Sequence, residues 1–141
     1  VINCTINNCT SDGIEITTAV ALSASSIQNN ILSNNGGYGL NVGVGSAALN
    51  DRITRGRFDY NNYYNNTSGA RNNLSAGAND TALDPQYTDA AGENFGIGTN
   101  LKATAFPGAF HGSSSTGYLD QGAVQRQEPA GGPFGGYLAM P

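Results

Sequence analysis

The feature that most constrains this chain is an internal repeat near its N-terminus. Shifting the sequence by 26 residues places residues 1–3 on residues 27–29 and residues 14–16 on residues 40–42, so that apolar positions fall on apolar positions. Self-similarity at a period in the twenties is typical of chains built from stacked structural units, because each unit is too small to bury its own apolar face.

A third unit follows the first two. Residues 61–66 align with residues 29–34 at a shift of about 32, and the insertion at residues 45–57 accounts for the longer spacing. Within each unit, apolar and polar residues alternate over three to five positions, which predicts short β-strands. No segment has the 3.6-residue period of a convincing amphipathic helix, so we expect an all-β chain.

Asparagine and glycine recur at fixed offsets and together supply 38 of the 141 residues. Both tolerate the left-handed backbone of a sharp corner, and an asparagine amide can bond its equivalent in the next unit. We therefore predict a ladder of corner asparagines at Asn8, Asn34 and Asn66. Inward-facing residues should form a narrow aliphatic core, with the first set stacked on the second: Val1, Ile6, Ile14 and Ile16 on Ile27, Leu32, Leu40 and Val42. The alternative is a compact β-sandwich with turn-rich hairpins.

The units have the form N-x-I-x-N-N-x4-G-[IL]-x-[IV] and resemble those of the right-handed parallel β-helix superfamily, which includes pectate lyases and many phage tailspikes. Three later segments, residues 83–89, 94–97 and 117–126, resemble the C-terminal end of uncharacterised β-helix repeat proteins. The resemblance implies the C-terminal part of such a protein, with about three rungs of a short right-handed parallel β-helix and a C-terminal cap within residues 1–126. It names no reaction, because the superfamily includes lyases, hydrolases and non-catalytic spikes.

The last segment, residues 127–141, differs in composition from the rest. It contains three prolines and four glycines, which is typical of an extended arm. We expect this arm to pack on a neighbouring subunit, with its large apolar residues as anchors: Phe134, Tyr137, Leu138 and Met140.

Charged residues are scarce. They make up 11% of the chain, against ~25% in an average soluble protein, and the net charge is -4. An acidic balance argues against nucleic acid as a partner, and no apolar run approaches the ~20 residues that would insert into a membrane.

Cys4 and Cys9 lack the second pair of ligands that a zinc site needs, so we interpret them as small half-buried apolar residues. His111 is interpreted as a loop residue, and no cofactor is expected.

The carboxylates do not form a ladder when the units are aligned. Asp12 falls on Tyr38 and Glu15 falls on Asn41, so a calcium cluster of the lyase type is not expected. A glycosidase needs two carboxylates ~5–9 Å apart, and Asp51 and Asp59 flank the insertion and could supply them. The alternative interpretation is that these are loop acids that balance the nearby arginines.

One basic and aromatic cluster accompanies the insertion. Its arginines precede its tyrosines, and the set consists of Arg52, Arg55, Arg57, Tyr60, Tyr63 and Tyr64. Tyrosine and arginine are favoured at contact surfaces, so this cluster could bind a carbohydrate or a partner protein. Equally, the aromatic residues could thicken the third rung and serve only its packing.

The sequence thus favours a non-catalytic structural module of a homomeric surface assembly, of the virion capsid-decoration or spike type. Its expected partners are copies of itself and neighbouring structural proteins, its expected location is a virion or extracellular surface, and the resemblance to phage proteins implies a trimer. The first rung has no visible cap, which also favours assembly. The alternatives are a fragment of a lyase or glycoside hydrolase, and a carbohydrate-binding surface module.

Overall fold

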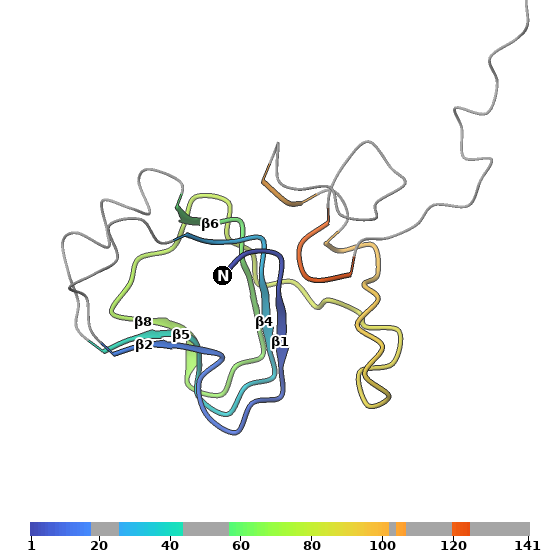
Figure 1. Ribbon diagram of the computed structural model, residues 1–141, viewed down its shortest axis with the longest axis horizontal. Helices are drawn as coiled ribbons and strands as arrows, with labels where there is room; N and C mark the ends of the chain where they lie inside the picture. The colour runs from blue at the N-terminus through green and yellow to red at the C-terminus, as the bar shows by residue number, and fades with distance from the viewer. Residues whose placement is uncertain (18–25, 44–56, 102–103, 107–119, 125–141) are drawn as a thin grey trace, which may run out of the picture.

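The strands form three parallel sheets in a computed structural model that describes residues 1–17, 26–43, 57–101, 104–106 and 120–124 (Figure 1). The first sheet contains β1 (Thr5–Asn7), β4 (Ile31–Ser33) and β7 (Asn62–Tyr64) in that order. The second contains β2 (Ile14–Ile16), β5 (Tyr38–Val42) and β8 (Gly69–Asn72). The third pairs β3 (Ile27–Gln28) with β6 (Phe58–Asp59). Every strand pair within these sheets is parallel.

The chain passes through the sheets in turn, so that strands of successive repeats lie on one another. We call the three passes rung 1 (residues 1–17), rung 2 (residues 26–43) and rung 3 (residues 57–74). An isolated parallel bridge between Ile2 and Gln28 continues the third sheet into rung 1. The all-β prediction is confirmed for the described residues, and the parallel sheets are compatible with a parallel β-helix.

The predicted 26-residue register between the first two rungs is confirmed, because Ile6 pairs with Leu32 and Ile14 with Leu40. The register of rung 3 differs from the prediction by one residue. Leu32 pairs with Tyr63, a shift of 31, whereas a shift of 32 would have placed Tyr64 under Leu32. A slip of one residue exchanges the two faces of a strand. The observed register places the ring of Tyr63 in the core.

The core lies inside the three sheets. Its buried members are Ile27, Leu32, Leu40, Val42, Phe58 and Tyr63, and the predicted stacking of rung 1 on rung 2 holds for Ile6, Ile14 and Ile16. Val1 differs from the expectation, because its side chain is 52% exposed at the end of the stack. The core therefore extends through rungs 2 and 3 and is only partly covered at rung 1.

Asparagines with left-handed backbone form the corners, as the sequence predicted. The corner between the first and second sheets uses Asn8, Asn34 and Asn65, whose φ angles are 60°, 55° and 51°. Asn65 replaces the predicted Asn66 in this ladder, which follows from the one-residue difference in register. Nδ2 of Asn65 donates to Oδ1 of Asn34 at 2.9 Å, so these two corner amides bond each other. Nδ2 of Asn34 instead donates to Oδ1 of Asn7, the residue before the rung 1 corner, at 2.9 Å.

A second set of asparagines forms ladders inside the corners. Nδ2 of Asn35 donates to Oδ1 of Asn66 at 2.8 Å, and Nδ2 of Asn30 donates to Oδ1 of Asn61 at 2.9 Å. In rung 1 the equivalent positions are Cys9 and Cys4, whose main-chain N–H groups donate to Asn35 and Asn30 at 3.0 Å. Both thiols are free and half-buried, so both inner amide ladders end at rung 1.

Described residues that follow the rungs, within 87–101 and 120–124, lie on the outer face of the first sheet, beside β1 and β4 (Figure 1). Ile31 points outward from β4 and packs with Ile97 and Leu101 in a second apolar cluster. Farther along, the N–H of Ala123 donates to the hydroxyl of Thr5 at 3.1 Å. This sheet is therefore covered on both faces, which explains why all of β4 is buried.

Candidate functional site

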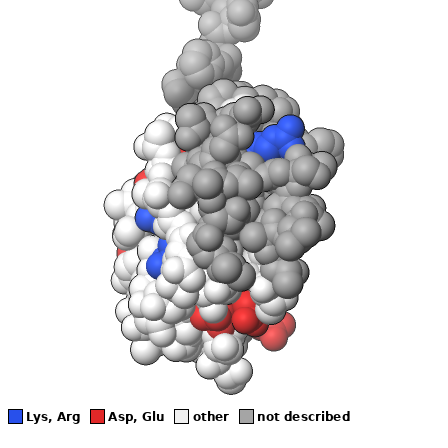
Figure 2. Space-filling view, turned by 90° about the vertical axis from the view of Figure 1, so that its left-hand side faces the viewer, with Lys and Arg blue, Asp and Glu red and all other residues white. Residues whose placement is uncertain are grey.

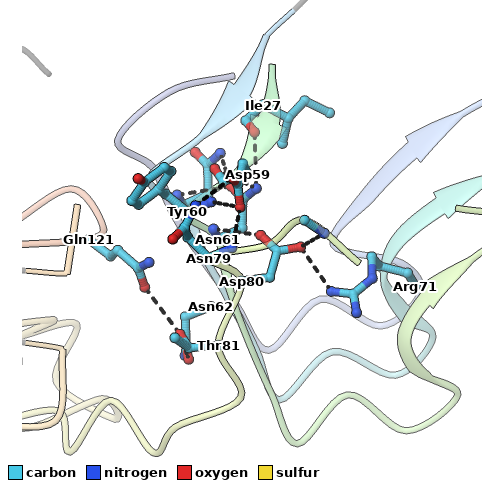
Figure 3. Close-up of polar contacts among 12 residues, drawn as sticks. Ile27, Asp59, Tyr60, Asn61, Asn62, Arg71, Asn79, Asp80, Thr81 and Gln121 are labelled. Carbon is cyan, nitrogen blue, oxygen red and sulfur yellow. Dashed lines mark hydrogen bonds and ion pairs between the residues drawn. The ribbon is translucent and has the colours of Figure 1, made fainter. Parts of the chain in front are cut away.

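The most concentrated polar cluster closes rung 3, and Asp80 is at its centre (Figure 3). One carboxylate oxygen accepts the N–H of Asn61 at 2.9 Å, which completes the inner ladder of Asn30 and Asn61. The other accepts the N–H of Gly77 at 2.9 Å and Nη1 of Arg71 at 3.1 Å. A carboxylate suits the end of an amide ladder because it only accepts hydrogen bonds.

Arg71 occupies a position that is aliphatic in the other rungs. It lies in β8, in register with Leu40 and therefore with Ile14, and points into the stack. Its guanidinium lies over the ring of Tyr63 at 4.6 Å, a distance at which the cation attracts the ring face. The ion pair with Asp80 is largely shielded from solvent, with side-chain exposures of 18% for Arg71 and 5% for Asp80.

Burial raises the pKa values of two groups in this cluster. It raises the pKa of Asp80 above its ordinary value, although two main-chain N–H groups and Arg71 oppose the rise. Burial, with a smaller contribution from Asp80, also raises the pKa of Tyr63, which keeps this phenol protonated at neutral pH. Tyr63 cannot act as a base under these conditions, and its ring serves the core.

Asp59 is buried beside this cluster, and all its hydrogen bonds serve the turn around it. One oxygen accepts the N–H groups of Tyr60 and Asn79, both at 2.8 Å, and the other accepts Nδ2 of Asn79 at 2.8 Å. A carboxylate committed to three donors of its own chain is poorly placed to reach a sugar. Asp51, its predicted partner in a glycosidase pair, lies outside the described residues.

The predicted basic and aromatic cluster is divided by the structure. Tyr63 lies in the core, whereas Tyr60 and Tyr64 are half-buried and Arg57 is exposed. The ring of Tyr60 contacts Phe106 edge-on, with 5.3 Å between ring centroids. Nothing in the sequence linked Phe106 to this cluster, because the two rings are 46 positions apart. Arg52 and Arg55 lie outside the described residues.

The outer face of the second sheet carries a polar array that the sequence analysis did not identify as a site. Asp12 accepts the N–H of Tyr38 at 2.6 Å and Nδ2 of Asn41 at 2.7 Å, and Asn72 donates to Asn41 at 3.0 Å. Glu15 is exposed in register with Asn41. The predicted 26-residue shift aligns Glu15 with Asn41, and the register of β5 with β8 adds Asn72 to this array. The side of the molecule shown in Figure 2 has acidic side chains gathered near its lower edge, apart from the basic ones.

Other predicted elements lie outside the described residues. They are His111 and the arm residues Phe134, Tyr137, Leu138 and Met140. Within the described ranges, no three His, Cys, Asp or Glu side chains group as metal ligands would. The same part of the chain contains no helix with the length and apolarity that crossing a bilayer requires.

Comparisons with known proteins found no family model, curated protein or solved structure that matches this chain.

Proposed function

We propose that this chain is a non-catalytic structural module, a short right-handed parallel β-helix that takes part in a homomeric surface assembly, such as a virion decoration or spike. The observation that carries this proposal is the use of the buried carboxylates. Asp59 and Asp80 direct their oxygens at main-chain N–H groups, an asparagine amide and one arginine of the same chain. Their chemistry holds the third rung together, which is an architectural use.

Rung 1 carries apolar side chains that are only partly covered. Val1 and Ile2 are about half exposed, and Ile6, Ile14 and Ile16 are only partly covered. Exposed apolar surface of this kind marks a site of contact with another element. The proposed arm, with Phe134, Tyr137, Leu138 and Met140, would make the contact with a neighbouring subunit.

The native mass of the purified chain tests this proposal. Multi-angle light scattering should report a particle of several chains, and deletion of residues 127–141 should release smaller species if the arm joins subunits. The same protein should produce no reducing sugars or unsaturated uronates from a broad panel of polysaccharides. Cleavage that disappears in Arg57→Ala would show instead that the chain is an enzyme.

A second candidate is a carbohydrate-binding module, which the outer face of the second sheet favours. Tyr38 is half-buried at the start of β5, and its main-chain N–H donates to the carboxylate of Asp12. An aromatic residue on a strand that also presents hydrogen-bonding groups suits a sugar. The acidic groups favour a neutral glycan over a uronate. Titration with a neutral β-glucan hexasaccharide tests this, with Tyr38→Ala as the variant and Tyr64→Ala as the control on another face. Equal binding by both variants would exclude this site.

A further inference from the structure

We propose that Asn35 and Gly36 form a site of spontaneous deamidation, which the folded chain holds inactive and which opening of rung 2 activates. Asn35 is the only asparagine in the sequence that a glycine follows. The pair lies at the corner between β4 and β5, and Asn35 bonds to Cys9 in rung 1 and to Asn66 in rung 3. The inference goes beyond the proposed assembly and does not depend on it.

The reaction needs only an asparagine side chain, the next main-chain nitrogen and water. The nitrogen of Gly36 loses its proton and attacks Cγ of Asn35, which forms a carbon–nitrogen bond and a cyclic succinimide. Nδ2 leaves with the released proton as ammonia. Water then opens the ring at either of its carbonyl carbons, and the product is aspartate or isoaspartate. Glycine favours the attack because no Cβ crowds its nitrogen and its backbone rotates freely.

The fold requires both members of this pair, so the reactive dipeptide follows from the packing. Asn35 is needed at the centre of an inner amide ladder, where it bonds in both directions. A Cβ added at Gly36 would overlap the main-chain O of Thr10. The equivalent positions in rungs 1 and 3 are Thr10 and Thr67, so glycine follows the ladder position only in rung 2.

In the folded chain, hydrogen bonds hold both reacting groups. The N–H of Gly36 donates to the O of Cys9 at 2.8 Å. The side chain of Asn35 is fully buried, and its Oδ1 accepts the N–H of Cys9 at 3.0 Å while its Nδ2 donates to Oδ1 of Asn66 at 2.8 Å. This side chain must break both ladder bonds before it can turn toward the nitrogen of Gly36. Burial also shields it from the water that hydrolysis consumes.

Deamidation would make the opening of rung 2 irreversible. With aspartate at position 35, an oxygen replaces Nδ2 and faces Oδ1 of Asn66 and the O of Ile6, which Nδ2 meets at 2.8 Å and 3.5 Å. A buried carboxylate that faces two acceptors is strongly unfavourable. Isoaspartate also adds one carbon to the main chain, which moves the residues after it out of register with the neighbouring rungs. The lifetime of the folded chain is then set by how often rung 2 opens.

Peptide mapping of the wild-type chain by mass spectrometry tests the site. In urea at mildly alkaline pH, Asn35 should deamidate first, and Asn66 before Thr67 is the internal control from the same ladder. Without urea, the rate at Asn35 should fall about tenfold for each 1.4 kcal/mol of the free energy that opens rung 2. Equal rates at Asn35 with and without urea would overturn the protection by the fold. Deamidation of Asn66 as fast as Asn35 in urea would overturn the assignment of the site.

Refolding tests the consequence without a mutation. Samples held in urea for increasing times are returned to buffer, and the folded and unfolded fractions are separated and mapped. The refolded fraction should shrink at the rate at which Asn35 deamidates, and aspartate or isoaspartate at position 35 should occur in the unfolded fraction alone. The same proportion of deamidated chains in both fractions would overturn the irreversible step.

A matched pair of variants tests whether opening of rung 2 controls the rate. Leu40→Ala removes a fully buried side chain of rung 2 and should raise the rate at Asn35 in buffer at least about 10-fold. Glu15→Ala changes an exposed residue and should leave the rate unchanged. Circular dichroism must show that both variants are folded, and the wild-type measurements stand in for a variant that is not. An unchanged rate in folded Leu40→Ala would overturn the inference.

Discussion

The two ends of the stack are built from the same repeat but end it differently. At rung 1, the inner ladder positions are Cys4 and Cys9, and the core side chains above them remain partly exposed. At rung 3, Asp80 accepts the last N–H of one ladder, and Arg71 lies over Tyr63. The rung 1 side therefore presents apolar side chains and main-chain hydrogen-bonding groups. At the rung 3 end, the charged side chains bond to groups of the same chain.

This difference shows how a repeat can stop at one end without a dedicated domain. A repeat unit leaves a polar ladder and an apolar core open at each end, and both must be covered for stability. Two residues cover the rung 3 end. Arg71 stands where the other rungs have Ile14 and Leu40, and Asp80, which follows the rung in the chain, accepts the N–H of Asn61. In rung 1, Cys4 and Cys9 stand at the inner ladder positions, and no ion pair among the residues that the structure describes lies over the core side chains.

We expect the largest loss of stability from a substitution that removes the Arg71 and Asp80 ion pair at the rung 3 end. Asp80→Ala leaves Arg71 without its counterion and two main-chain N–H groups without acceptors, and should lower the free energy of unfolding by about 3–5 kcal/mol. Urea denaturation measures this. The control is Asp12→Ala in rung 1, a half-buried residue for which we expect a loss of about 1 kcal/mol. Similar losses at both sites would refute the difference between the two ends.

The next prediction compares the loss of stability on truncating paired core residues in rungs 1 and 2, which differ in burial. Leu40→Ala removes a fully buried side chain and should cost about 2–5 kcal/mol. Ile14→Ala, at the paired position in rung 1, should cost roughly half as much in dilute protein, because its side chain is partly exposed. Equal costs at the two positions would contradict the difference in burial between the two rungs.

A smaller effect concerns the inner ladder. Asn35→Cys removes the acceptor of the Cys9 N–H and the donor to Asn66, and should cost about 1–3 kcal/mol. The reverse change, Cys9→Asn, adds an amide at the open end and should alter stability by less than about 0.5 kcal/mol. Thermal unfolding of both variants measures the contrast. A large loss in Cys9→Asn would mean that the thiol itself is required.

The smallest effect is a pH dependence confined to rung 3. Because burial raises the folded pKa of Asp80 above the value of the unfolded chain, its protonated form is favoured by folding. This contribution to stability is fully present below the ordinary pKa of an aspartate and is lost as pH rises through the folded value. Denaturation curves at several pH values should show this loss, and Asp80→Ala should lack it. A wild-type and variant difference that is constant with pH would contradict the prediction.

Much of rungs 1 and 2 could be predicted from the sequence because their signals are local. Ile14 and Ile16 alternate with Glu15, and Asn8 and Asn34 stand where the backbone becomes left-handed. Rung 3 was harder to predict, since two asparagine pairs, residues 61–62 and 65–66, permit two alignments that differ by one residue. Only the burial of Tyr63 under Leu32 decided between them.

The polar cluster of rung 3 could not be read from the sequence for a different reason. Arg71 and Asp80 belong to no motif in the sequence, although the two are only nine positions apart. Their pairing depends on the inward direction of β8, which is a property of the register. The contact of Tyr60 with Phe106 depends likewise on how the C-terminal segment returns to the first sheet.

The sequence by itself therefore determined the repeat, the strand type and the residues that face inward in the first two rungs. These features depend on the alternation of apolar and polar residues and on the corner asparagines. Both signals lie within a few consecutive residues of the sequence. The tertiary structure decided the register of rung 3, the Arg71 and Asp80 closure, and the cover on the first sheet. The physical reason is distance along the chain. Thr5 and Ala123 are 118 positions apart, and only the folded chain brings them into contact.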